Sequence, residues 1–254
     1  AEGNPFFLEE LARTVREQDR FSADTPVPDT VEEVLRTRID HLRPRERRLL
    51  QTAAVVGRHA PIALLRAVSG LPEGELTEAL AGLKAAEFLF EDSVISEDGL
   101  SFTHALTLEV AYGSLARSDR RQTHALIGSA IERLHPERLA DYTERLAHHM
   151  FRGEVWDKAV AYSQQAGERA LARAAYREGI AWLEQALEAL GRQTEGSDQQ
   201  QQAVDLRLQL RAALTPLGEH DRIFTYLREA ETLAAKLDDQ RRLGLITAYL
   251  ADYH

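Results

Sequence analysis

Cysteine is absent from this chain of 254 residues. Its absence excludes disulfides, thiolate nucleophiles and zinc sites built on cysteine, and it makes the cytoplasm the expected location. Long hydrophobic runs are also missing: no stretch approaches the ~18 uncharged apolar residues of a membrane-spanning helix, so we expect no membrane partner. Proline (8 residues) and glycine (15) are scarce whereas Ala, Leu, Glu, Arg and Gln dominate, which favours a mostly helical protein.

The motifs of common enzyme chemistries are missing as well. None of the three lysines, Lys84, Lys158 and Lys236, follows a glycine, so the chain has no Walker A site for nucleotide phosphates. There is no Gly-x-Ser-x-Gly elbow and no His-Glu-x-x-His pattern, and the adjacent His148 and His149 point to different faces of a helix. We therefore expect no catalytic residue, no metal site and no cofactor in this chain, which is not an enzyme by itself.

Positive charge is in the minority. The net charge of -10 works against sequence-independent nucleic-acid binding, which depends on Lys and Arg neutralising phosphates. The helix expected from Pro72 to Glu87 carries four glutamates against the single Lys84. We expect no nucleic-acid partner, although a cluster of arginines from Arg43 to Arg48 keeps DNA binding open as an alternative.

Seven of the eight prolines lie at or before Pro136, so two architectures should meet near that residue. Before it, the spacing of apolar residues and the positions of Pro and Gly predict a series of amphipathic helices. They include 6–17, a helix capped by Asp29 or Thr30, a helix from Pro44 to Val56 that stops at Gly57, and Pro61–Ser69. Apolar residues then alternate at 88–90 and 100–102 across an acidic turn, as in a β-hairpin. Helices followed by a small hairpin are the winged-helix arrangement. A helix resumes at His104.

From residue 139 onward, large aromatic and small residues recur at helical spacing. Trp156, Ala159, Tyr162 and Ala166 are followed by the matching set Tyr176, Gly179, Trp182 and Ala186, and more faintly by Tyr226 and Ala230. Small residues let helices approach closely, so the pattern predicts an α-α superhelix of degenerate tetratricopeptide-like repeats. Gly191–Gln202 should be an exposed loop, and apolar residues on the last helix lead us to expect further repeats in a longer protein.

Four passages together resemble one family. They are Gly3–Leu11, Val27–Leu35, Phe102–Tyr112 and Ala159–Leu190, and they are similar in order to the signal-transducing ATPases with numerous domains, which are fused to bacterial class III adenylate or guanylate cyclases or to LuxR-type regulators. Leu206–Gly218 and 226–239 look closer to the cyclase-linked branch. The resemblance implies a helical lid remnant at 1–28, a winged-helix domain with following helices at 29–136, and repeats at 137–254.

The resemblance also implies a nucleotide site that this chain only borders. Pro5 looks like the proline that lies near adenine, and His104 like the histidine of a Met-His-Asp motif that approaches the β-phosphate, whereas Thr103 and Ala105 replace the motif's other two residues. ATP or ADP would then bind in the parent protein, on an adjoining ATPase core in cis. The chain itself would be a regulatory module whose repeats bind a protein, a peptide or a small ligand, and the alternative is a DNA-binding winged-helix regulator.

Overall fold

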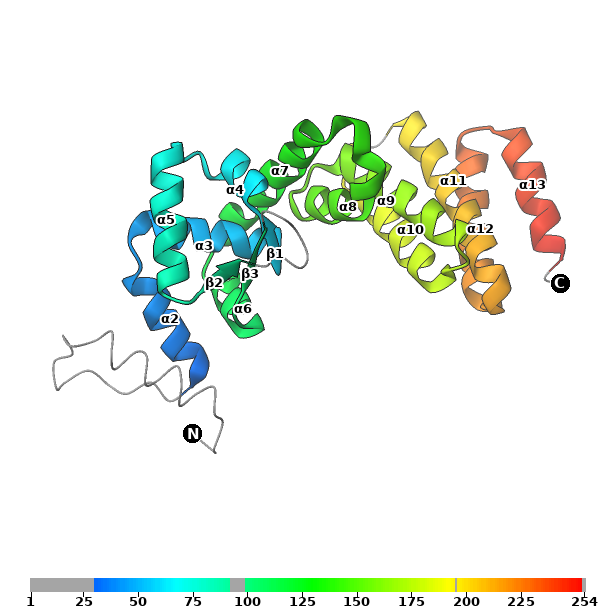
Figure 1. The fold of residues 1–254 in the computed structure, drawn as a ribbon. Coiled ribbons are helices and arrows are strands. Elements are labelled where there is room, and N and C mark those ends of the chain that lie inside the picture. Colours follow the sequence, from blue (N-terminus) through cyan, green and yellow to red (C-terminus); the bar gives the residue numbers. More distant parts are fainter. Residues whose placement is uncertain (1–29, 92–98, 195, 253–254) are drawn as a thin grey trace. The chain divides into compact units, whose positions relative to one another are not determined.

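In a computed structural model of the protein, the structure describes residues 30–91, 99–194 and 196–252 (Figure 1). The expected helix at 6–17, the lid segment 1–28 and Pro5 lie outside these residues. The chain divides into two units, residues 1–130 and 131–254, which are described separately below. The division falls inside α7 (Arg117–Leu134), whereas the sequence places the change of architecture at residue 136.

The first unit contains short helices and a small sheet. In chain order its elements are α2 (Val31–His41), α3 (Pro44–Val56), β1 (His59–Pro61), α4 (Ile62–Ser69), α5 (Glu73–Ala85), β2 (Leu89–Glu91), β3 (Gly99–Phe102) and α6 (Ala105–Gly113), before α7 begins. Local chemistry sets several of the boundaries. Thr30 caps α2 in a capping box with Glu33, and Pro44 is the first residue of α3. The predictions for both helix starts are confirmed.

The sheet has three antiparallel strands in the order β1-β3-β2. The predicted hairpin corresponds to β2 and β3, and β1 was not predicted, since the sequence assigned Pro61 to a helix. With only three residues, β1 is too short to show an alternation of apolar and polar side chains in the sequence. It forms because His59 pairs with Ser101 of the central strand. Pro61 is tolerated because β1 is an edge strand.

A buried arginine joins α2 to the end of α5. The Arg38 side chain is only 5% exposed, its Nη2 donates to the carbonyl oxygen of Ala86 at 2.8 Å, and its guanidinium lies 4.7 Å from the ring centre of Phe88. A buried cation needs such partners to offset its desolvation. Together with the buried Leu35 and Ile39, Arg38 fixes the face that α2 turns to the core.

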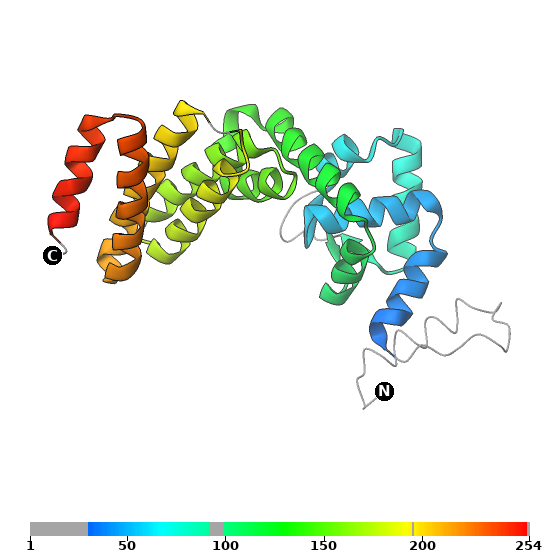
Figure 2. The same cartoon turned by 180° about the vertical axis from the view of Figure 1, so that it is seen from behind.

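The second unit is an α-helical stack. After the end of α7 come η1 (Pro136–Tyr142), α8 (Thr143–Arg152), α9 (Trp156–Ala172), α10 (Tyr176–Leu190), α11 (Ser197–Leu214), η2 (Thr215–Leu217), α12 (His220–Lys236) and α13 (Gln240–Ala251). From α8 to α13 each long helix packs on the next one in the chain, as the view in Figure 2 shows. The mostly α fold with a repeated helical stack agrees with the prediction.

One local prediction in this unit is wrong. Residues 197–202 were expected in a loop, but they form the start of α11, with Gly196 as the residue before the helix. Glutamine has a good intrinsic helix propensity, so the polar run after Gly196 can continue into a helix whose later residues, such as Val204 and Leu206, are buried.

The helices α9 and α10 approach closely at two glycines. A Cβ on Gly167 would lie 2.9 Å from the Leu183 Cγ and 3.3 Å from the Gly179 carbonyl oxygen. Conversely, a Cβ on Gly179 would lie 2.7 Å from a Leu171 methyl carbon and 3.3 Å from the Gly167 carbonyl oxygen. Ala166 is also fully buried, so small side chains on both helices allow this approach, as the aromatic-small pattern predicts.

We expect Gly179→Ala to lower the free energy of unfolding by about 1–3 kcal/mol, because the added methyl overpacks the contact with Leu171. Gly244→Ala is the matched control: Gly244 lies in α13 with open space around it, so alanine there should stabilise by about 0.5–1 kcal/mol. Urea denaturation of both variants measures the difference. Equal effects of the two substitutions would contradict the close approach.

Candidate functional site

His104 lies where the sheet meets the next helix. Strand β3 ends at Phe102, and His104 is the N-cap residue of α6 in an extended conformation, with φ -137° and ψ 142°. Thr103 fixes this corner, because its hydroxyl donates to the Glu87 carbonyl oxygen at 2.7 Å and its amide donates to the Phe88 carbonyl oxygen at 3.2 Å. The position of the predicted histidine at a strand-helix junction is therefore set by contacts of its neighbour.

The imidazole of His104 is half-buried at the beginning of α6. It makes no capping hydrogen bond to the helix, whose first turn is held instead by the His104 carbonyl oxygen accepting from the Thr107 amide at 3.1 Å. The beginning of a helix favours negative charge. A histidine beside it can contact an anion such as a phosphate. Pro5, the other predicted nucleotide contact, lies outside the described residues.

The basic side chains around α5 are held by carboxylates. Lys84 Nζ lies 2.7 Å from Glu91, the Arg66 guanidinium makes two hydrogen bonds to Glu73 at 2.8 and 2.9 Å, and Arg45 lies 3.1 Å from Glu75. The ion pair with Lys84 lowers the pKa of Glu91, so this carboxylate stays charged. These pairs leave little free positive charge on this face of the first unit.

In the second unit, carboxylates connect helices that are not adjacent in the chain. Glu132 of α7 accepts from Lys158 Nζ at 2.6 Å and from the Tyr162 hydroxyl at 2.8 Å, both on α9. Glu184 of α10 accepts in the same way from Arg222 and Tyr226 of α12, at 2.6 and 2.7 Å. We call these two arrangements the carboxylate clamps.

A related contact joins the last pair of alternate helices. Arg242 of α13 makes a bidentate pair with Asp205 of α11, with both distances 2.8 Å. In each of these three contacts, a carboxylate on one helix meets a cation on the α-helix two places later in the chain. The sequence carries one regularity that marks the clamps: a cation is followed four residues later by tyrosine in both α9 and α12. What the sequence does not show is which glutamate each pair would meet.

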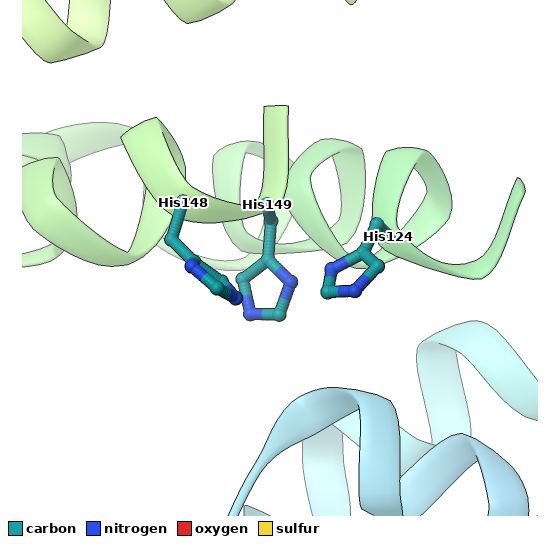
Figure 3. A group of neighbouring side chains, drawn as sticks. All are labelled: His124, His148 and His149. Atoms are coloured by element: carbon teal, nitrogen blue, oxygen red, sulfur yellow. The ribbon is translucent and has the colours of Figure 1, made fainter. Parts of the chain in front are cut away.

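The three histidines drawn in Figure 3 belong to different units. His148 and His149 are neighbours on α8 with ring centres 5.3 Å apart, and burial together with the Arg152 charge lowers the pKa of His148. His124, on α7 within the first unit, is buried with its Nε2 3.1 Å from the Tyr112 hydroxyl. In the part of the chain that the structure describes, neither unit alone gathers three metal-ligating side chains, and the expected lack of a metal site stays a prediction.

The chain was compared with known proteins. No protein-family model matches the chain. An uncharacterized protein of Rhizobium meliloti (strain 1021) is 29% identical over 226 residues, which are 85% of this chain and 21% of that protein. The chain thus spans about a fifth of the length of this relative.

One solved structure is also similar. It is the crystal structure of a Signal Transduction ATPase with Numerous Domains protein with a tetratricopeptide repeat sensor from Pyrococcus horikoshii. The match covers 96% of this chain and 39% of that chain, with 10% identity and a TM-score of 0.37. Among the described residues, no helix has the length and apolar character to cross a membrane.

The carboxylate clamps predict a loss of stability at alkaline pH. Burial, and then the hydrogen bond to the glutamate, raises the pKa of Tyr162 and of Tyr226 from 10.0 to about 12. Folding thus favours the protonated phenols, so their contribution is complete below pH 10 and is lost as the pH rises toward 12.

Replacing both tyrosines by phenylalanine should therefore flatten the dependence of the melting temperature on pH between 10 and 12. Tyr176→Phe is the control, because the Tyr176 hydroxyl contacts no carboxylate in the described ranges. If the melting temperature falls equally steeply with pH in the double variant and in the control, the ionisation of the two clamp tyrosines is not coupled to unfolding.

Proposed function

We propose that the chain is a non-catalytic regulatory and interaction module of a multidomain bacterial signalling ATPase, with a cyclase-linked parent and a cytoplasmic location. In this proposal the first unit is a winged helix that closes on nucleotide bound to an ATPase core in cis, and the helical stack binds a protein, peptide or small ligand. The chain supplies neither the phosphate cradle nor catalytic residues, so ATP or ADP would be held by the parent.

The position of His104 carries the proposal. The order α3, β1, α4, α5, β2, β3 with an antiparallel β1-β3-β2 sheet supports the proposal of a winged helix. His104 follows the last strand of this arrangement and precedes α6, as the histidine does in the family that the sequence resembles. This place at the beginning of α6, where the helix favours negative charge, supports a contact to a phosphate supplied by another domain.

The repeats support the second half of the proposal. Stacked helical repeats expose long surfaces that bind partners, and the contacts between alternate helices make such a stack able to transmit a change at one end. The relative from Rhizobium meliloti is about five times longer than the matched segment, which suits a module within a larger protein.

We expect His104→Ala, in a longer protein that includes the ATPase core, to speed ADP release and raise basal activity, because one contact holding the resting state is lost. His41→Ala is the matched control, since His41 is exposed at the end of α2 and its Nδ1 lies 2.7 Å from the Thr37 carbonyl oxygen of its own helix. Stopped-flow release of a fluorescent ADP analogue measures the effect. Identical release rates in the wild type and both variants would exclude the nucleotide-sensing role.

DNA binding, the alternative, has one feature in its favour, the arginines at the start of α3. Three of them lie beside carboxylates, with Arg45 3.1 Å from Glu75, Arg47 3.4 Å from Asp40, and Arg43 4.0 Å from Glu46. Phosphate contacts need cations that are free to neutralise them. The face around α5 therefore favours contact with protein over contact with DNA.

Random duplex DNA should bind the chain no more tightly than about 100 µM at about 50 mM salt, where phosphate-driven binding is strongest. A triple variant, Glu73→Gln, Glu75→Gln and Glu91→Gln, removes the carboxylates that hold Arg66, Arg45 and Lys84, and should bind more tightly. Fluorescence anisotropy measures both. Micromolar binding by the wild type that weakens steeply with salt would favour the DNA-binding alternative.

A further inference from the structure

A groove of about 250 Å³ lies within the second unit, at one edge of the helical stack. The end of α10, the beginning of α11 and the end of α12 form its walls. Its lining includes three leucines, Leu187, Leu190 and Leu233, which we call the leucine floor. It also includes polar residues, among them Gln193, Gln200 and Lys236, which we call the rim. Since a water molecule in the liquid occupies about 30 Å³, the groove has room for a large apolar side chain and the adjoining backbone.

The charge of the groove differs from that of the chain. The protein has 41 acidic and 31 basic residues, yet in the described ranges no residue that lines the groove carries a carboxylate. Two cations, Arg207 and Lys236, line it instead. A ligand that carries negative charge would meet no repulsion from these walls.

The two cations differ in how they are held. Arg207 Nε lies 2.8 Å from Glu229, and its Nη1 donates to the Ala203 carbonyl oxygen at 3.0 Å, so its charge is already compensated. Lys236 is exposed and pairs with no carboxylate in the part of the chain that the structure describes. Its ammonium is therefore the cation that a ligand can engage.

We infer that this groove binds an acidic peptide segment. A carboxylate of the peptide pairs with Lys236, the glutamine side chains of the rim donate to and accept from its peptide groups, and an apolar side chain next to the acid is buried on the leucine floor. A single free cation suits an isolated carboxylate better than the phosphate array of a nucleic acid. The inference deepens the proposed function by naming the partner chemistry of the repeats.

The experiment uses the 254-residue chain and a labelled peptide of alternating Asp and Leu with blocked ends, compared with the same peptide containing Asn in place of Asp. Fluorescence anisotropy at low and high salt gives the dissociation constants. We expect the Asp peptide to bind at least about tenfold more tightly than the Asn peptide at low salt, with the difference shrinking as salt screens the charge.

Two variants test the groove itself. Lys236→Glu reverses the free cation and Gln200→Glu adds a carboxylate to the rim, so each should weaken binding of the Asp peptide about tenfold or more. Arg177→Glu makes the same charge reversal as the first variant on an exposed residue near the other end of α10, and should change affinity by less than about twofold. Melting curves check that all three variants fold.

The inference is overturned if the wild type binds the Asp and Asn peptides equally or binds neither, or if all three variants weaken binding alike. It is also overturned if binding survives both groove variants. These outcomes concern the helical stack alone and leave the role of His104 to be judged by ADP release, so failure of the groove and failure of the proposed function are distinguishable.

Discussion

The second unit depends on the close approach of two backbones at Gly167 and Gly179. With no Cβ at either position, the side chains of Leu171 and Leu183 fill the space where α9 and α10 meet. Polar contacts between alternate helices add to this packing. Glu184 and its counterpart on α7 then accept from a cation and a tyrosine two helices further along the stack.

Local chemistry made much of the fold predictable. The cap at Thr30 and the proline that starts α3 act within one turn of chain, and the alternation that predicts β2 and β3 needs no distant partner. The start of α11 and the strand β1 were missed for different reasons. β1 is decided by pairing with Ser101, far along the chain, and this pairing outweighs the presence of Pro61. The start of α11 is polar, which suggests a loop, although glutamine has a good helix propensity.

The sequence predicts where His104 lies in the fold, but it does not predict which residues surround it. The strand-to-helix change around His104 is visible in the sequence, whereas the bonds of Thr103 that hold the corner join residues 16 apart. The groove was not predictable, because residues from 187 to 236 line it and only the stacking of three helices brings Lys236 beside the leucine floor. A single exposed lysine has no signature in sequence.

The central claim is that the beginning of α6 faces a nucleotide held by a neighbouring ATPase core. Hydrogen–deuterium exchange on a longer protein that contains both parts, with and without ADP, tests it most directly. The account predicts that ADP slows exchange of the amides at 103–108, which contain His104 and the first turn of α6, and leaves the amides of α13 unchanged. Exchange at 103–108 that is the same with and without ADP, in a protein shown to bind the nucleotide, would contradict the account.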